Sequence, residues 1–402
     1  MCTVAAPATG VPAVSRLELA DIVRVHGDTY RQAHRLASVQ DRALRAIATC
    51  RTAALGGHTD TCDQCGATRS AYNSCRNRHC PKCQHTAEVA WLAARQAELL
   101  PIPYFHVVFT LPHHLNALTQ GNPRVLYAAL FRAAADTLLT FGRDPRHLGG
   151  TLGVTAILHT WGQNLSQHVH LHCVVTGGAL AADGGRWIAA KDGFLFPVRA
   201  LSVVFRAKYL DALQQAFTAK RLTFASGTAD LAAPDAFARF VAELRTAPWV
   251  VYAKRPFGGP AQVLQYLGRY THRVAISNAR LVDLQDGVVR FRWKDYADHD
   301  RPKVMALSAD EFLRRFLLHV VPRGFVRIRY FGLLANRRRR AQLDRCRVVL
   351  GAPTPAAPSA ESPTASPGPS AALRRCSHCG IGVLHVTTVP ASRALPAPRD
   401  TS

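Results

Sequence analysis

The apolar residues in the middle of the chain follow two different periods. Residues 168–176 alternate histidines with apolar side chains, and a period of two indicates a strand with two unlike faces. Apolar segments rich in β-branched or aromatic residues predict further strands at residues 104–111, 151–160, 249–254, 278–284, 287–293 and 325–330. Apolar spacings of three to four predict helices at residues 123–141, 198–217, 234–246 and 309–320. The pattern therefore predicts a mixed fold of helices and strands.

The N-terminal part of the chain has a different pattern. Residues 15–54 have helical spacing and few helix breakers, and the glycine pair Gly56-Gly57 ends this region. A cysteine-rich stretch follows, and then a short predicted helix at residues 86–100. We therefore expect a helical region and a small cysteine-rich module ahead of the mixed region.

Length and charge narrow the classes of function. The chain has 402 residues, enough for two or three domains. Its 50 Lys and Arg against 26 Asp and Glu give a net charge of +24, which favours a polyanionic partner such as nucleic acid. No apolar stretch approaches the ~18–20 residues of a membrane span, and the first residues lack the regions of a signal peptide. We expect a cytoplasmic protein that joins the nucleoid when bound to DNA and has no membrane partner.

Five of the eleven cysteines fall between Cys62 and Cys83. In a reducing cytosol, clustered cysteines bind metal more often than they form disulfides. The pairs Cys62/Cys65 and Cys80/Cys83 are separated by fourteen residues, a spacing with which four thiolates surround one Zn²⁺ tetrahedrally. We predict one structural Zn²⁺ at these four cysteines. The alternative ligands, or members of a second site, are Cys75, His58, His79 and His85.

Basic residues lie among these predicted ligands. Arg76, Arg78 and Lys82 are candidates for contacts to DNA phosphates. A solvated basic face is an equally good interpretation of the same residues.

A third cysteine pair lies near the C-terminus. Cys376 and Cys379 follow a stretch at residues 351–370 with six prolines, which we expect to be disordered. Two cysteines make only half a zinc site. The candidates to complete it are His378, His385, Cys346 and a partner chain, and a knuckle without metal is equally compatible with the sequence.

Three histidines stand in alternation on the strand at residues 168–176. His168, His170 and His172 share one face, because successive residues of a strand point to opposite faces. Burial of three unpaired imidazoles would be costly, so we interpret the strand as a divalent-metal site. His168 and His170 are the first choice as ligands, with His172 third. Other possible ligands are His106, His159 and His272.

The metal at this strand would act as a Lewis acid on a scissile phosphate. Mg²⁺ or Mn²⁺ suits that chemistry better than Zn²⁺, and histidine ligands favour Mn²⁺ over Mg²⁺.

Two tyrosines lie about a hundred residues further on. Tyr266 and Tyr270 are four residues apart on a predicted helix that Pro260 opens, so they are neighbours on one face. Taken alone, this spacing is typical of core residues in an amphipathic helix. Beside a metal strand they become candidate nucleophiles, although a phenol needs activation by a metal or a base. Arg269 and Arg273 are candidates to position phosphates, or are simply exposed polar residues.

Three segments together resemble a known family. YNSCRNRHCPKCQ at residues 72–84, HTWGQNLSQHVHLHCVVTGGAL at 159–180 and YLGRYTHRVAISNARL at 266–281 are similar to insertion-sequence-ninety-one-type rolling-circle transposases. The order of the zinc module, histidine strand, tyrosine helix and basic C-terminal region matches as well. The resemblance covers roughly residues 58–340. Such proteins are HUH nucleases, which act on single-stranded DNA with a catalytic core of antiparallel sheet and helices.

The resemblance implies an α+β fold and roles for particular residues. It makes Tyr266 and Tyr270 the nucleophiles and His168 and His170 metal ligands. Many HUH enzymes take a third ligand from a polar residue on the tyrosine helix, but here Val274 stands four residues after Tyr270, so the third ligand stays open. The sequence has no Walker phosphate loop, so any helicase would come from the host.

Together these observations predict four parts. They are a helical region (1–55), a zinc-binding, DNA-contacting domain (56–100), an HUH two-tyrosine catalytic domain (101–345) and a Pro/Ala-rich tail with a terminal cysteine pair (346–402). The expected function is transposition, in which single strands are nicked and rejoined at element ends through a 5′-phosphotyrosine. The alternatives are a plasmid or phage replication initiator or relaxase with the same chemistry, and a non-catalytic zinc DNA-binding protein.

Overall fold

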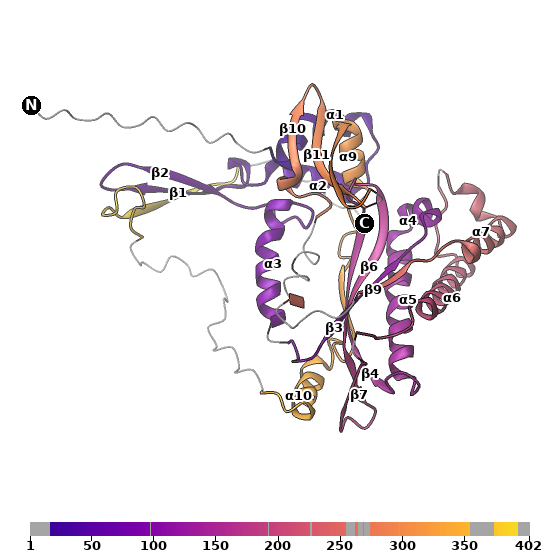
Figure 1. Ribbon diagram of the computed structural model, residues 1–402. Coiled ribbons are helices and arrows are strands. Elements are labelled where there is room, and N and C mark those ends of the chain that lie inside the picture. The colour runs from indigo at the N-terminus through magenta and orange to yellow at the C-terminus, as the bar shows by residue number, and fades with distance from the viewer. Residues whose placement is uncertain are drawn as a thin grey trace, which may run out of the picture.

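The computed structural model of the chain has the predicted α+β fold, with helices and antiparallel sheets (Figure 1). It describes residues 17–96, 98–191, 193–225, 227–254, 262–263, 268, 274–296, 298–353 and 374–392. Tyr266, Tyr270 and most of the proline-rich stretch lie outside the described residues.

A five-stranded sheet forms the centre of the molecule. Its strands, in spatial order, are β13 (Ile328–Gly332), β5 (Gly153–Trp161), β6 (Gln167–Thr176), β3 (Tyr104–Thr110) and β9 (Val251–Lys254). All neighbouring strands are antiparallel, and His172 of β6 lies opposite Ile157 of β5 and Val108 of β3. The strand with the histidines is therefore the middle strand of the sheet.

Helices cover one face of this sheet. They are α4 (Asn116–Gly121), α5 (Pro123–Arg143), α6 (Val198–Thr218) and α7 (Pro234–Thr246), which lie together beside the sheet in Figure 1. The apolar half of β6, including Val169 and Leu171, joins Phe109 and Phe205 in the largest hydrophobic core. By length and composition α5 could cross a membrane, but most of its apolar stretch is buried inside the protein. It packs as a core helix.

The opposite face of the sheet carries the histidines and a second, smaller core. Tyr104, Ile157 and Val174 point to this side and pack with Val263 and with Leu343 of α10 (Arg339–Val349). The helix α3 (Pro81–Gln96) lies on the same side in Figure 1, and its Trp91 packs against this core. α3 begins five residues before its predicted start.

The N-terminal helices share a third core with a segment far away in sequence. α1 (Leu19–Ala33) and α2 (Ser38–Thr49) pack with α9 (Ala309–Leu317) and with a three-stranded sheet. The strands of that sheet are β10 (Leu281–Gln285), β11 (Val288–Asp295) and β12 (Arg301–Ser308). Trp161, at the end of β5, belongs to the same core. This core joins the N-terminal helices to the end of the central sheet.

Two small sheets complete the fold. One is ordered β14-β1-β2, with β1 (Gly57–Cys62), β2 (Thr68–Tyr72) and the C-terminal β14 (Leu384–Val389), and it projects from the body in Figure 1. The other consists of β4 (Gly150–Thr151), β7 (Gly178–Ala181) and β8 (Trp187–Ala189). Short 3-10 helices lie at Ala53–Leu55, His113–Leu115, Ala229–Ala232 and Asn278–Arg280. The C-terminal strand β14 thus pairs with β1, which follows the N-terminal helices.

The packing of α6 on the sheet gives a test of the core. Phe205 is fully buried, and its ring centroid lies 4.9 Å from that of Phe109. Phe205→Ala should lower stability by about 3–5 kcal/mol, because it removes buried surface and leaves a cavity. Val203→Ala, on the exposed side of the same helix, should change stability by less than about 0.5 kcal/mol. Denaturant midpoints of the two variants would check this, and equal midpoints would contradict the packing.

Candidate metal centres

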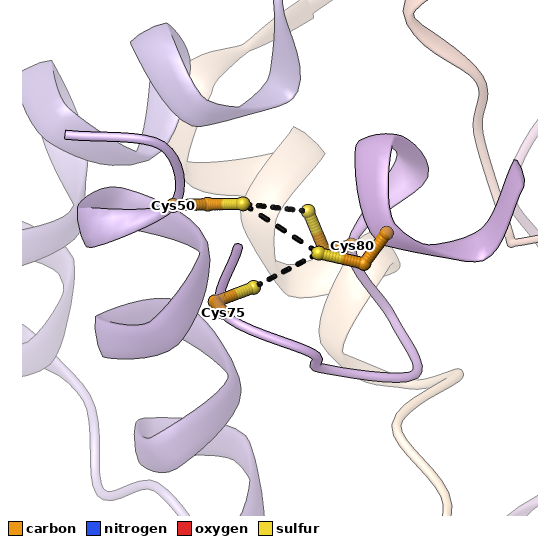
Figure 2. Close-up of side chains that lie close together, drawn as sticks. Cys50, Cys75 and Cys80 are labelled. Carbon is orange, nitrogen blue, oxygen red and sulfur yellow. Dashed lines mark hydrogen bonds between the residues drawn. The ribbon is translucent and has the colours of Figure 1, made fainter. Parts of the chain in front are cut away.

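Four cysteines from the N-terminal part converge on one point. They are Cys50 directly after α2, Cys75 in the loop between β2 and α3, and Cys80 and Cys83 at the start of α3. Their Sγ atoms are 3.5 Å apart for Cys75 and Cys83, and 3.6 Å apart both for Cys50 and Cys83 and for Cys50 and Cys80. Figure 2 shows Cys50, Cys75 and Cys80 pointing toward one another. We call these four residues the core cysteine cluster.

The sulfur geometry of the core cysteine cluster fits a zinc ion. A disulfide would bring two sulfurs to about 2.0 Å, so these cysteines are not bridged. Four sulfurs about 2.3 Å from a tetrahedral Zn²⁺ are about 3.8 Å from one another, close to the observed separations. Hydrogen bonding to Cys75 lowers the pKa of the Cys80 thiol to about 5, while burial raises that of Cys50 to about 11. Binding of Zn²⁺ would deprotonate the remaining thiols.

A second set of cysteines comes from two segments that lie far apart in the sequence. Cys62 ends β1 and Cys65 follows it, whereas Cys376 and Cys379 precede β14. The Sγ atoms are 3.7 Å apart for Cys62 and Cys379 and 3.8 Å apart for Cys65 and Cys376. We call these four residues the terminal cysteine cluster.

The prediction of one site made of Cys62, Cys65, Cys80 and Cys83 is therefore wrong. The strand β1 carries the first pair out to β14, whereas the second pair begins α3 beside the end of α2. Among the alternative ligands, Cys75 joins the core cysteine cluster, but the buried His79 does not. Cys50 was missed because it stands alone in the sequence, without a neighbouring cysteine to mark it.

Three imidazoles converge on the histidine face of the central sheet. His159 comes from β5, and His170 and His172 come from β6, where His170 lies opposite His159. His168 is not part of this trio. Its ring lies 5.4 Å from that of His113, further along the strand. His159 thus replaces His168 in the predicted set of His168, His170 and His172.

Hydrogen bonds orient the rings of the histidine trio. Nδ1 of His170 lies 2.8 Å from the backbone oxygen of His168, and Nδ1 of His172 lies 2.9 Å from Nε2 of His106. When each Nδ1 donates in these contacts, the Nε2 atoms of His170 and His172 keep their lone pairs. Those two Nε2 atoms are 3.1 Å apart. Two ligands about 2.1 Å from one cation, at right angles, are about 3.0 Å apart, so the pair fits a shared metal.

Burial keeps the imidazoles of His170 and His106 neutral. It lowers the pKa of His170 to about 3 and, together with Lys254 and His170, that of His106 to about 3. Neutral imidazole is the form that binds a metal.

The histidine trio lines a cavity of about 270 Å³. Arg280 and Tyr296 from the β10–β12 region reach its wall, as does His168. The described lining residues include no carboxylate. Nε of Arg280 donates to the backbone oxygen of Arg292 at 2.7 Å, and a second nitrogen of the same guanidinium donates to that of Gln163. These hydrogen bonds hold the guanidinium cation of Arg280 at the cavity wall, where its charge attracts an anionic ligand.

The predicted DNA-contact residues of the zinc module have different surroundings. Arg76 is exposed. Arg78 donates to the backbone oxygen of Phe325 at 2.7 Å, and burial lowers the pKa of its guanidinium. Lys82 forms an ion pair with Glu18 at 2.7 Å. Arg78 and Lys82 therefore have partners within the protein, while Arg76 faces solvent. Arg269 and Arg273 lie outside the described residues.

Two described positions border the tyrosines in sequence. Val263 is fully buried in the core on the histidine side of the sheet. A Cβ built on Gly268 would lie 2.8 Å from Cδ1 of Leu92 and 3.1 Å from Oε1 of Glu88, both on α3. At these two positions the chain packs against the sheet and against α3, respectively.

The chain is similar to known transposases. Residues 22–111 match the family profile "Transposase zinc-binding domain", and residues 153–342 match "Putative transposase". The chain is 57% identical over 347 residues to "Putative transposase y4qJ" of Sinorhizobium fredii, covering 86% of this chain and 87% of that protein. It is 29% identical over 308 residues to "Transposase for insertion sequence element IS801" of Pseudomonas savastanoi pv. phaseolicola, covering 75% and 72%. No solved structure matches.

The protein is thus a DNA transposase with a zinc-binding domain, and the cysteine clusters support structural Zn²⁺. Within that class, the chain belongs to the insertion-sequence-ninety-one-type transposases.

The core cysteine cluster makes a prediction about Cys50. Cys50→Ser should lower the zinc content by about one ion per chain, as Cys80→Ser should, because each removes one of four ligands. Cys346→Ala is the control, since Cys346 is a buried cysteine outside both clusters. Metal analysis of the purified proteins would check this. Full zinc content in Cys50→Ser would show that Cys50 is not a ligand.

Proposed function

We propose that this transposase nicks and rejoins single-stranded DNA at element ends through a covalent 5′-phosphotyrosine, as in rolling-circle transposition. The observation that carries the proposal is the convergence of His159, His170 and His172 on one face of the sheet. Val263, three residues before Tyr266, is buried in the core on that same face. In this proposal, Tyr266 and Tyr270 act on the same side of the sheet as the histidine metal site.

A divalent cation at the histidine trio would supply Lewis acid chemistry to the scissile phosphate. Mg²⁺ and Mn²⁺ are the candidates, and the all-imidazole trio favours Mn²⁺. His159 takes the place of the third ligand that many HUH enzymes draw from a polar residue after the tyrosines, because Val274 at that position is apolar and buried. His106 and the backbone of His168 hold the liganding rings in orientation.

The tyrosines carry the covalent step in this proposal. The oxygen of one phenol attacks the phosphorus, the bond to the 3′ oxygen breaks, and the phenol proton ends on the released 3′-hydroxyl. The phosphotyrosine keeps the energy of the phosphodiester, so the reverse attack by a 3′-hydroxyl rejoins DNA without ATP. Tyr266 and Tyr270 together allow two successive transfers without release of the DNA.

Arg280 is the residue we assign to the phosphate. Its guanidinium lies at the wall of the histidine cavity, and its two backbone partners hold it there. A fixed cation in this place offsets the charge that develops on the phosphate oxygens. Arg76, which is exposed, is assigned to the DNA backbone outside the cavity.

The proposal also covers the cellular setting. The substrate is single-stranded DNA, a host helicase supplies the strand, and the reaction takes place in the cytoplasm at the nucleoid. The zinc-binding profile and the names of the relatives favour a transposase over a replication initiator or relaxase. A non-catalytic zinc protein would bind the same DNA but form no covalent adduct.

Covalent capture tests the proposed function directly. Labelled single-stranded DNA that carries an element end is incubated with the protein and Mn²⁺ and run on a denaturing gel. A slow protein–DNA adduct should form with the wild type and disappear in Tyr266→Phe/Tyr270→Phe. Each single variant separates the role of one tyrosine. Tyr252→Phe, an exposed tyrosine on the edge strand β9, should form the adduct normally.

Two results of this assay would speak against the mechanism. An adduct that persists in the double variant would place the nucleophile elsewhere. Normal DNA binding by the wild type, with no adduct at any concentration of metal, would leave the protein a binding module.

The grouping of the histidines predicts which of them adduct formation requires. His159→Ala and His170→Ala should each slow adduct formation by about 100-fold or more, because a metal contributes several kcal/mol to the transition state. His168→Ala should slow it much less, since its ring lies outside the trio. His114→Ala, an exposed histidine, is the control. Single-turnover rates at several Mn²⁺ concentrations would check this, and a larger effect of His168→Ala than of His159→Ala would restore the sequence-based set.

A further inference from the structure

The terminal cysteine cluster is built from two copies of one local motif. Residues 62–66 and 376–380 both read Cys-x-x-Cys-Gly. In each copy the amide of the glycine donates to the backbone oxygen of the first cysteine, at 3.1 Å for Gly66 and 2.9 Å for Gly380. Both glycines have left-handed φ angles, 68° and 75°. Glycine adopts that conformation without strain, so the two turns are formed in the same way.

The second turn also directs backbone donors at its own sulfurs. The amide of His378 lies 3.3 Å from Sγ of Cys376, and the amide of Gly382 lies 3.4 Å from Sγ of Cys379. Such N–H groups stabilise negative charge on sulfur, the state in which cysteine binds a metal.

The two turns face each other closely. The amide of Asp63 donates to the backbone oxygen of Val383 at 3.1 Å, and the amide of Val383 donates to Oδ1 of Asp63 at 2.8 Å. A Cβ on Gly382 would lie 2.3 Å from Sγ of Cys62, so this approach needs glycine. Beyond the turns, β1 and β14 pair in continuous antiparallel register from Gly57 and Val389 to Cys62 and Leu384.

We propose that Cys62, Cys65, Cys376 and Cys379 bind a second Zn²⁺, which joins the segment around β1 to the C-terminal segment in one zinc ribbon. The cross-pair sulfur separations of 3.7 and 3.8 Å match the edge of a tetrahedral site, about 3.8 Å. Binding replaces four thiol protons, which go to solvent, by one divalent cation. This site is separate from the core cysteine cluster and exists whether or not the tyrosines cut DNA.

The metal is the main stabilising element of this ribbon. All of β2 is exposed, and β14 has no fully buried residue. None of the three hydrophobic cores among the described residues includes a member of β1, β2 or β14. A small sheet without an apolar core needs a metal or a disulfide to stay folded. Loss of this zinc should therefore release the C-terminal segment while the body stays folded.

The core cysteine cluster differs in this respect. Cys50 and Cys80 are buried in one core with Leu44 and Ile47. In the terminal cysteine cluster, Cys65 is exposed. A chelator should therefore remove the terminal zinc first.

Zinc content per chain tests the proposal in the full-length protein. The wild type should hold about two Zn²⁺, and Cys376→Ser/Cys379→Ser about one. Cys62→Ser/Cys65→Ser, and the variant with all four changes, should also hold about one, because all four residues share one ion. Ser377→Ala/His378→Ala alters the same turn without touching a sulfur and should keep both ions.

Full zinc content in Cys376→Ser/Cys379→Ser would overturn the proposal. So would additive losses from the two cysteine pairs, because they would place the pairs in different sites. A loss in Ser377→Ala/His378→Ala would make His378 a ligand in place of one cysteine.

Hydrogen exchange measures the predicted release of the tail. In the wild type the amides of β1 and β14 should be protected, and this protection should be lost in Cys376→Ser/Cys379→Ser or after mild chelation. The amides of β5 and β6 should stay protected, which shows that the body is still folded. Protection of β14 that persists without zinc would mean that strand pairing alone holds the segment, and would overturn the role given to the metal.

Discussion

Side chains on β6 alternate between two environments, and most of the architecture follows from that alternation. Val169, Leu171 and Cys173 point into the core under α5 and α6, so the strand is held rigidly from one side. The residues between them, His170 and His172, point to the other side. A shift of register by one residue would bury imidazoles in the apolar core and expose the apolar residues, at a large cost in free energy. The core therefore also fixes where the histidines face.

The strands next to β6 supply further residues of the histidine site. Antiparallel pairing sets His159 of β5 opposite His170, and His106 of β3 reaches His172 with its ring nitrogen. The histidine site thus depends on three adjacent strands rather than on one motif. Its other wall comes from the β10–β12 region, whose Arg280 is anchored to Gln163 in the loop after β5. The N-terminal helices pack on that same region, so they support the wall of the cavity.

The sequence predicted the elements better than it predicted their partners. Periodic segments such as residues 234–246 matched the observed helix α7, because local side-chain spacing determines which face is buried. The zinc ligands were grouped wrongly because Cys-x-x-Cys spacing predicts a metal-binding turn. The spacing does not predict which second turn packs against the first. Cys376 and Cys379 lie more than three hundred residues from Cys62, and only strand pairing between β1 and β14 brings them together. His159 was one alternative among several, since the register of β5 on β6 is a tertiary property.

Metal ligation and apolar packing stabilise different parts of this chain. The core cysteine cluster joins the end of α2 to the start of α3, and this junction is embedded in an apolar core. α3 then runs along the histidine side of the sheet, where Leu92 packs on Gly268. α3 is thus a packed path from the core cysteine cluster to Gly268. The ribbon has no such path, because its strands share no core with the body. Zinc at the first site would therefore order a helix that borders the proposed catalytic face, whereas zinc at the proposed second site would order only the segments around β1 and β14.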